Sequence, residues 1–275
     1  FLHADLDDKD DGVYIVTPPK LLVRHGFVQE GTVWKLNKVL YGLRAGPKRW
    51  SDHHDRVLKE LKVTNGGRSA TIVQMKECKN MWTIMTDDEE IVGRMMVYVD
   101  DVLVTGEENW IRATMEAINK TWECKIDGVL GVDAKELNFL GVSLGLTQKG
   151  EVLMHQKKYF LTKLQKRNML HGRGKWTLPS IDEGKFTPSI KDKEYHKNLK
   201  NCQEEIGTLM WLGIKTREDI LTAVSIAASM QTRTPEKTLT YVEGIWKYLA
   251  MTWNEVKVIR PDVLSWRLVI TTDAS

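Results

Sequence analysis

The run Met95-Met96-Val97-Tyr98-Val99-Asp100-Asp101-Val102-Leu103-Val104 places two adjacent acids inside an apolar, β-branched stretch. Val, Tyr and Leu on both sides of the acids are typical of two short buried strands. Asp100 and Asp101 then fall at the turn between these strands. The run therefore predicts a tight hairpin with two carboxylates at its tip.

The acid pair has two interpretations. Asp is common in turns because it tolerates their dihedral angles and faces water. This turn, however, lacks the Gly or Asn that a two-residue hairpin loop prefers. The apolar flanks also predict that the carboxylates lie close to a core and repel each other. A divalent cation would relieve that repulsion, because hard cations take carboxylate oxygens.

Length and composition set broad limits on the fold and its partners. The chain has 275 residues, enough for one large domain or two smaller ones, and its 42% apolar content supports a sizeable core. Forty basic residues against 37 acidic ones leave a net charge of +3. This near balance does not by itself indicate a nucleic-acid-binding protein.

The cysteines indicate a reducing compartment, and the chain ends indicate a longer polypeptide. Cys78, Cys124 and Cys202 lie far apart without metal-ligand spacing, which is typical of reduced thiols in a cytosolic or nuclear protein. No run of 18 apolar residues predicts a membrane span, and no signal peptide opens the chain. Because Phe1 is not Met and Ser275 follows a strand-like run, we expect a piece of a longer polypeptide.

Helical and strand periodicities extend along the chain. Helices are predicted over 50–61, 107–124, 201–215, 218–230 and 235–251, and strands over 72–85, 91–99, 137–146, 151–155 and 268–275. His53 and His54 cannot share one helical face, which favours surface polar residues over a metal site. The acidic cluster Asp5–Asp11 has Lys9 where an EF-hand needs a ligand, which favours a solvated turn.

Several strings together resemble a known family. Tyr98-Val99-Asp100-Asp101 resembles the Y-x-D-D motif of reverse transcriptases, and its surroundings resemble Ty1/copia-type retrotransposon polyproteins. Residues 33–44, Val-Trp-Lys-Leu-Asn-Lys-Val-Leu-Tyr-Gly-Leu-Arg, resemble the family's V-x-K-L-x-K-A-L-Y-G-L-K. Further matches are Val13-Tyr14 with Pro18-Pro19, Pro47 with Trp50, Phe139-Leu140-Gly141, Thr216-Arg217-Glu218-Asp219-Ile220 and Ala223-Val224-Ser225.

The resemblance implies an α+β fold: a right-hand polymerase palm with an antiparallel sheet and helices, followed by a helical thumb-like region. It implies a palm with part of the fingers over 1–170, a linker over 171–196 and a thumb-like region over 197–254. Residues 255–275 would be a connection and the first strand of a truncated ribonuclease H domain, with Asp273 as its first metal-binding acid.

The implied activity is RNA-directed DNA polymerisation by two-metal nucleotidyl transfer. Asp100 and Asp101 would be the catalytic acids and the ligands of two Mg²⁺ ions, with Mn²⁺ as an alternative, held roughly 3.5–4 Å apart. The partners would be an RNA or DNA template with primer, deoxynucleoside triphosphates and the rest of the Pol polyprotein, integrase upstream and ribonuclease H downstream. The location would be cytoplasmic or nuclear, in a virus-like particle for intact elements.

The resemblance also implies binding residues. Nucleotide contacts would come from Phe1, Tyr41, Gly42 and Tyr98. Phe1 would exclude a ribose 2′-hydroxyl, although a buried strand aromatic is the alternative. Primer and template contacts would come from Phe139, Leu140, Gly141, Lys157, Lys158, Lys163 and Lys166.

The four lysines belong to a stretch that has no acid between Glu151 and Asp182. Such a stretch is either a solvated helix face or a surface for a phosphate backbone, where each neutralised Lys or Arg releases a counterion. The resemblance favours nucleic acid.

Three departures from the family pattern support an alternative function. Ala45 replaces a Gln that shapes the nucleotide pocket, and Glu218 replaces a Pro. Phe1-Leu2 resembles the end of D-V-x-x-A-F-L, so the first catalytic Asp would lie upstream. The alternatives are a catalytically inactive or decayed fragment that binds nucleic acid, and a structural relic without either activity.

Overall fold

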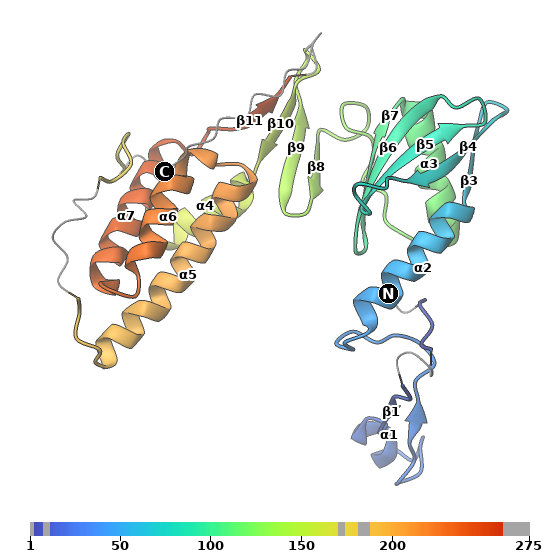
Figure 1. The fold of residues 1–275 in the computed structure, drawn as a ribbon, viewed down its shortest axis with the longest axis horizontal. Coiled ribbons are helices and arrows are strands. Elements are labelled where there is room, and N and C mark those ends of the chain that lie inside the picture. Colours follow the sequence, from blue (N-terminus) through green and yellow to red (C-terminus); the bar gives the residue numbers. More distant parts are fainter. Residues whose placement is uncertain (1–2, 8–11, 170–173, 181–187, 261–275) are drawn as a thin grey trace. The chain divides into compact units, whose positions relative to one another are not determined.

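The computed structural model describes residues 3–7, 12–169, 174–180 and 188–260. The chain divides into two compact units, Phe1–Val129 and Leu130–Ser275, and each contains helices and antiparallel sheet (Figure 1). The predicted mixture of helix and sheet is therefore confirmed. Phe1, Asp273 and the strand predicted over 268–275 lie outside the described residues.

The first unit is built around a five-stranded antiparallel sheet in which each strand pairs with the next in sequence. Its strands are β3 (Lys62–Asn65), β4 (Arg68–Gln74), β5 (Met81–Thr86), β6 (Ile91–Tyr98) and β7 (Asp101–Gly106). Helices α2 (Gly46–Glu60) and α3 (Glu108–Thr121) pack against this sheet. A small sheet of β1 (Ile15–Val16) and β2 (Trp34–Lys35), with the short helix α1 (Lys20–Arg24), precedes them.

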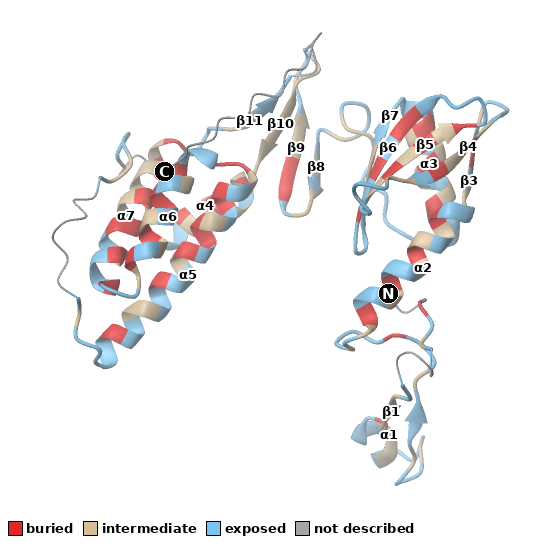
Figure 2. Cartoon of the chain, in the orientation of Figure 1, coloured by how far each residue is buried: buried red, intermediate tan, exposed pale blue. Residues whose placement is uncertain are grey.

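Alternating burial explains the sheet. Along β5 the side chains of Trp82, Ile84 and Thr86 are buried, and their neighbours are half-buried, as expected when successive side chains point to opposite faces. Trp110 and Ile118 of α3 join the same core. Figure 2 shows buried positions along the strands of this sheet.

Two predicted element boundaries in this unit were wrong. The single strand predicted over 72–85 is interrupted, because the polar residues between Met75 and Met81 form a turn and leave β4 and β5 as separate strands. Helix α2 also begins earlier than predicted, at Gly46. Pro47 is compatible with the first turn of a helix, where its missing N–H would have no partner inside the helix.

The prediction that His53 and His54 are surface residues was wrong for His54. Its side chain is buried, and His54 Nδ1 lies 2.9 Å from Asp55 Oδ1. Asp55 Oδ2 accepts a hydrogen bond from Gln74 Nε2 at 2.9 Å, so the helix is tied to β4. Burial lowers the pKa of His54, and the neighbouring Asp55 opposes that change.

The second unit combines a four-stranded sheet with a helical core. The sheet order is β11-β10-β9-β8, formed by β8 (Glu136–Phe139), β9 (Val142–Leu146), β10 (Val152–His155) and β11 (Lys257–Ile259). The helices are α4 (Lys157–Lys166), α5 (Lys193–Lys215), η2 (Glu218–Ile220), α6 (Leu221–Met230) and α7 (Pro235–Met251). Leu209, Leu212, Ile245, Trp246 and Leu249 are almost fully buried among them.

The helices of this unit follow the predicted pattern with different boundaries. Helix α5 begins at Lys193 rather than at residue 201. The side chain of Asp192 caps this N-terminus, because it accepts a hydrogen bond from the Tyr195 backbone N–H at 2.7 Å. The single strand predicted over 137–146 was wrong, because a turn at Leu140-Gly141 divides it into β8 and β9.

Strand β11 was not predicted. It pairs antiparallel with β10, from Val152 opposite Ile259 to Met154 opposite Lys257. The last described strand of the chain is thereby joined to a strand that begins at residue 152. Among the described residues, no helix has the length and apolarity needed to cross a membrane.

Candidate active site at the β6–β7 hairpin

The predicted hairpin is confirmed, but one of its acids lies inside a strand. Tyr98 of β6 pairs with Asp101 of β7, which leaves Val99 and Asp100 as the two-residue loop. Asp101 is the first residue of β7 rather than part of the loop. The carboxylate of Asp101 is therefore carried by a residue paired within the sheet, and that of Asp100 by the adjoining turn.

The turn has an unusual backbone. Val99 has a φ of 55°, whereas the φ of Asp100 is not positive. This sign pattern is that of a type II′ turn, whose first position normally holds Gly. A left-handed conformation costs an L-residue about 1–2 kcal/mol, and it is a clear outlier for a β-branched one. Such strain persists only where the surroundings enforce it, which occurs mainly at functional sites.

The prediction that the carboxylates lie close to a core was wrong. Asp100 and Asp101 are both exposed, and Tyr98 and Val99 are about half exposed, at 51% and 49%. The nearest fully packed residue of β6 is Val97. The acids are therefore accessible to solvent at the end of the hairpin.

Trp50 holds the turn from helix α2. Its indole Nε1–H donates a hydrogen bond to the Val99 carbonyl at 2.8 Å. The Trp50 side chain is 8% exposed and packs with Ala4 and Val39, which are both fully buried. The Val39 N–H donates to the Ala4 carbonyl at 3.0 Å, so two further segments cover the indole.

Tyr41 is the second contact to the turn. Its hydroxyl donates to Asp100 Oδ2 at 3.4 Å, which is long for this type of bond. Desolvation and the negative charge of Asp100 raise the pKa of Tyr41 above its ordinary value of 10.0. Because Tyr41 is 69% exposed, the carboxylate is the more important cause. Gly42 follows with a φ of 96°.

Two of the predicted nucleotide-binding residues are thus placed near the acids, Tyr41 by its contact with Asp100 and Tyr98 by its position at the end of β6. Gly42 is adjacent to Tyr41 in sequence. Phe1 lies outside the described residues.

The two acids of the hairpin are not part of a larger group of metal-ligating side chains in the described residues. Within the part of the chain that the structure describes, no group of three or more His, Cys, Asp or Glu side chains could hold a metal ion. The hairpin alone supplies two carboxylates, which are hard oxygen ligands of the kind that Mg²⁺ uses in combination with water and substrate phosphates.

The predicted primer-binding residues Phe139, Leu140 and Gly141 lie in the second unit, at the β8–β9 turn. Leu140 and Gly141 form the loop, with φ values of 50° and 76°. Positive φ at both positions is the type I′ pattern that two-residue hairpins favour. A Cβ added at Gly141 would lie 3.3 Å from Trp211 Cζ2 of α5.

The four predicted template-binding lysines all lie on α4. Lys158 and Lys166 are exposed, whereas Lys157 and Lys163 are half-buried. The ammonium of Lys163 lies over the ring of Tyr159, 5.4 Å from its centroid. The neighbouring Arg167 has an acidic partner from another helix, since it pairs with Glu205 and its guanidinium lies 4.1 Å from the ring of Trp246.

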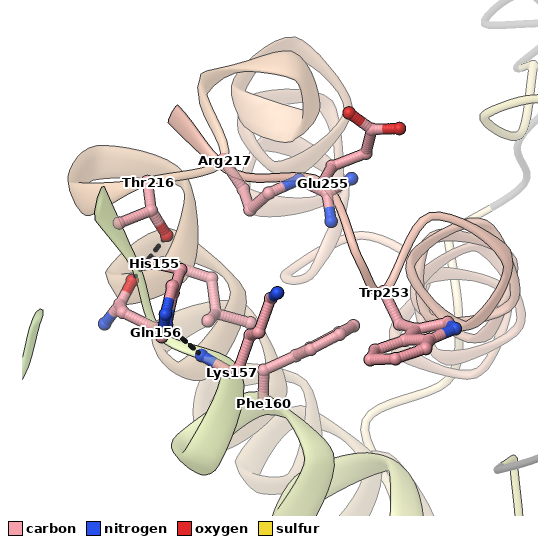
Figure 3. A pocket seen from close by; sticks show the side chains of 9 residues that line it. His155, Gln156, Lys157, Phe160, Thr216, Arg217, Trp253 and Glu255 are labelled. Atoms are coloured by element: carbon pink, nitrogen blue, oxygen red, sulfur yellow. Dashed lines mark hydrogen bonds between the residues drawn. The ribbon is translucent and has the colours of Figure 1, made fainter. Parts of the chain in front are cut away.

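Lys157 also lines a pocket of about 240 Å³, a volume that includes its open mouth. Figure 3 shows its ammonium pointing into the space enclosed by the lining side chains, beside Phe160 and below Arg217. Arg217 is occupied by structural contacts, because it binds both carboxylate oxygens of Asp219 at 2.9 and 2.8 Å and the carbonyl of Thr252 at 3.0 Å. Of Lys157 and Arg217, the lysine therefore has fewer side-chain contacts among those described.

Two residues have roles that no sequence pattern predicts. Trp50 matches the family pattern, but nothing in the sequence around it indicates that its indole bonds to the carbonyl of Val99. Arg217, within Thr216-Arg217-Glu218-Asp219-Ile220, joins η2 to the end of α7. Burial opposes ionisation of Asp219, but the ion pair with Arg217 outweighs it and lowers the pKa of Asp219.

Comparisons with known proteins assign the chain to a family. Residues 1–181 match the family described as reverse transcriptase (RNA-dependent DNA polymerase). The chain is 26% identical to the retrovirus-related Pol polyprotein from transposon RE1 of Arabidopsis thaliana, over 92% of the chain and 16% of that protein. It is 24% identical to the corresponding polyprotein from transposon TNT 1-94 of Nicotiana tabacum, over 93% and 18%.

A third relative is the transposon Ty1-DR1 Gag-Pol polyprotein of Saccharomyces cerevisiae, 22% identical over 100% of the chain and 15% of that protein. The chain thus spans less than a fifth of the length of these curated relatives. No solved structure matches it significantly. Because the family match covers most of the chain and includes the β6–β7 hairpin, this chain belongs to the reverse transcriptase family of Ty1/copia-type retrotransposon Pol polyproteins.

Proposed function

We propose that this chain contributes the polymerase palm and a thumb-like helical region to template-directed DNA synthesis by a retrotransposon Pol polyprotein. The palm, with part of the fingers, would comprise residues 1–170, and the thumb-like region would comprise residues 197–254, which include most of α5 and all of α6 and α7. The observation that carries the proposal is the strained β6–β7 turn, which presents Asp100 and Asp101 to solvent in the Y-x-D-D arrangement.

Asp100 and Asp101 would hold the Mg²⁺ of the reaction. Their fit rests on the chemistry of the donors, two exposed carboxylates on a rigid hairpin with no basic partner at their tip in the described contacts. When bound, the metal supplies charge stabilisation for the attacking and leaving oxygens. The chain itself fixes the position of Asp100 through the turn, and Tyr41 keeps a neutral donor beside that carboxylate.

The decisive variant is Asp100→Asn. It keeps the size of the side chain and removes its charge, so we expect primer extension to fall by at least about 10²–10³, the loss typical of one transition-state contact. Asp87→Asn is the matched control, because Asp87 is an exposed acid in the turn at the other end of β6. The assay uses the 275-residue chain and a longer piece of the polyprotein, since the resemblance implies a further catalytic Asp before Phe1.

We expect efficient extension only from the longer polypeptide, and its loss in Asp100→Asn but not in Asp87→Asn. Extension by Asp100→Asn within a few-fold of the parent would remove Asp100 from the mechanism. A longer polypeptide that binds primer–template and never extends it would favour the alternative, an inactive nucleic-acid-binding fragment.

The lysines of α4 would contact the phosphate backbone of the template and primer. Lys158 and Lys166 are the strongest candidates because both are exposed. Removing one lysine–phosphate pair should reduce the slope of log affinity against log salt by about 0.9. Replacing both lysines with Gln should therefore flatten the salt dependence of primer–template binding by about two, and an unchanged slope would show that they face solvent only.

A further inference from the structure

The Val99–Asp100 peptide joins the two central residues of the β6–β7 turn. In a two-residue hairpin this peptide can take two orientations. The type I′ and type II′ forms both have positive φ at the first position, but they differ in the sign of φ at the second. The structure has the type II′ pattern, positive at Val99 and not at Asp100.

The sequence by itself does not favour this orientation. Type II′ normally requires Gly at its first position, and Val is among the least suitable residues there. Asp, in contrast, tolerates the left-handed conformation that type I′ would give it at position 100. Something outside the turn must therefore select the observed form.

The contact that distinguishes the two orientations is the hydrogen bond from Trp50 Nε1–H to the Val99 carbonyl, at 2.8 Å. This carbonyl belongs to the same peptide whose rotation interconverts the two forms. The donor is itself fixed, because Trp50 is 8% exposed and its ring lies 5.7 Å from His53 and 6.0 Å from Trp122.

We infer that Trp50 is a positioning residue for polymerisation: its indole N–H holds the Val99–Asp100 peptide in the type II′ orientation and thereby sets the direction of the Asp100 carboxylate. Without this donor the peptide rotates toward type I′, the φ of Asp100 changes sign and its carboxylate leaves the working position. The kinetic part of this inference rests on the proposed function, and the conformational part does not.

The test compares Trp50→Phe, which keeps an aromatic ring and removes the donor, with Trp122→Phe, which alters a neighbouring ring of the same cluster. Nuclear magnetic resonance of the 275-residue chain reports the turn through cross-relaxation between the Val99 and Asp100 amide protons. These protons lie close together only when the central peptide is rotated to type I′. We expect a strong signal in Trp50→Phe alone.

A measurement on the unaltered chain protects the test against a variant that fails to fold. The Trp50 indole proton should exchange with water at least tenfold more slowly than that of Trp176, whose side chain is 70% exposed. Equal exchange of the two protons, or a turn unchanged by Trp50→Phe in a folded chain, would overturn the inference.

The kinetic readout uses the longer polypeptide. Removal of one hydrogen bond of ordinary strength should lower kcat about fivefold to tenfold, with KM for the deoxynucleotide within about twofold of the parent. An inactive Asp100→Asn with a fully active Trp50→Phe would overturn this inference and leave the proposed function intact. A fully active Asp100→Asn would overturn the proposed function, while the turn signal would still decide the role of Trp50.

Discussion

Two hairpins of this chain have loops of the same length and opposite construction. The β8–β9 loop, Leu140-Gly141, has positive φ at both residues and Gly at the second. The β6–β7 loop, Val99-Asp100, has positive φ at a β-branched residue and no Gly. The first follows the local preferences of hairpins, whereas the second contradicts them and is held from α2 by Trp50.

The difference separates a turn that its own residues stabilise from a turn that the rest of the unit stabilises. Local agreement between sequence and structure is the general rule, and departures from it concentrate at functional sites. The chain places Asp100 in the unfavourable turn and Asp101 directly after it, at the start of β7. Gly141→Val should therefore destabilise the β8–β9 hairpin, and Val99→Gly should stabilise the β6–β7 hairpin.

The largest effect on stability is expected from Gly141→Val. It forces a β-branched residue to a φ of 76° and brings its Cβ to 3.3 Å from Trp211 Cζ2. We expect the β8–β9 hairpin to lose about 2 kcal/mol, measured as faster amide hydrogen exchange along β9. Gly207→Ala is the control, because a Cβ there has no atom within 4 Å and the site is helical. Unchanged exchange in Gly141→Val would mean that the loop does not depend on Gly.

The reciprocal change, Val99→Gly, should stabilise the β6–β7 hairpin by about 1 kcal/mol. Gly relieves the left-handed strain, and the greater freedom of the unfolded chain offsets part of the gain. Amide exchange along β6 should become slower. Primer extension in the longer polypeptide should stay within about twofold of the parent, because Gly favours type II′ at this position and the bond from Trp50 goes to a backbone carbonyl that Gly retains. A less stable variant, or a severalfold loss of extension, would contradict the strain argument.

The smallest effect concerns Tyr41, whose pKa is raised by desolvation and by the Asp100 carboxylate. Because the folded pKa is the higher one, the contribution of this contact is present below the unfolded value of 10.0. It is lost as the pH rises through the folded value. We expect the carbon resonance of the Tyr41 phenol to titrate above pH 10 and to return toward 10 in Asp100→Asn. An identical titration in both chains would show that the hydroxyl does not sense the carboxylate.

Periodicity predicted the elements of this fold better than their ends. The apolar run on either side of Asp100 predicted the hairpin correctly, because alternating β-branched residues carry a local signal. The same method joined β4 to β5 across the polar turn before Met81, and β8 to β9 across Leu140-Gly141. In both cases apolar residues on the two flanks outweighed the turn signal between them.

The site itself was predictable only in part. The motif predicts Asp100 and Asp101 as the acids of the site, whereas their exposure depends on how far the hairpin extends beyond the core. The bond between Trp50 and Val99 joins residues far apart in the chain, and no spacing rule predicts it. The burial of His54 likewise depends on Gln74 of another element, which contacts Asp55 beside it.

Strand β11 has a consequence for the order in which the second unit is made. The partner of β10 at this sheet edge consists of residues 257–259, which the ribosome delivers after all the described helices of the unit. Until then β10 presents unpaired backbone groups, which makes it a template for wrong strand pairing. A nascent chain halted before residue 257 should therefore show more protease cleavage in β10 than one halted well after residue 260, and equal cleavage would show that the edge needs no cover. The edge of β10 is thus covered only after the described helices of the unit have been synthesised.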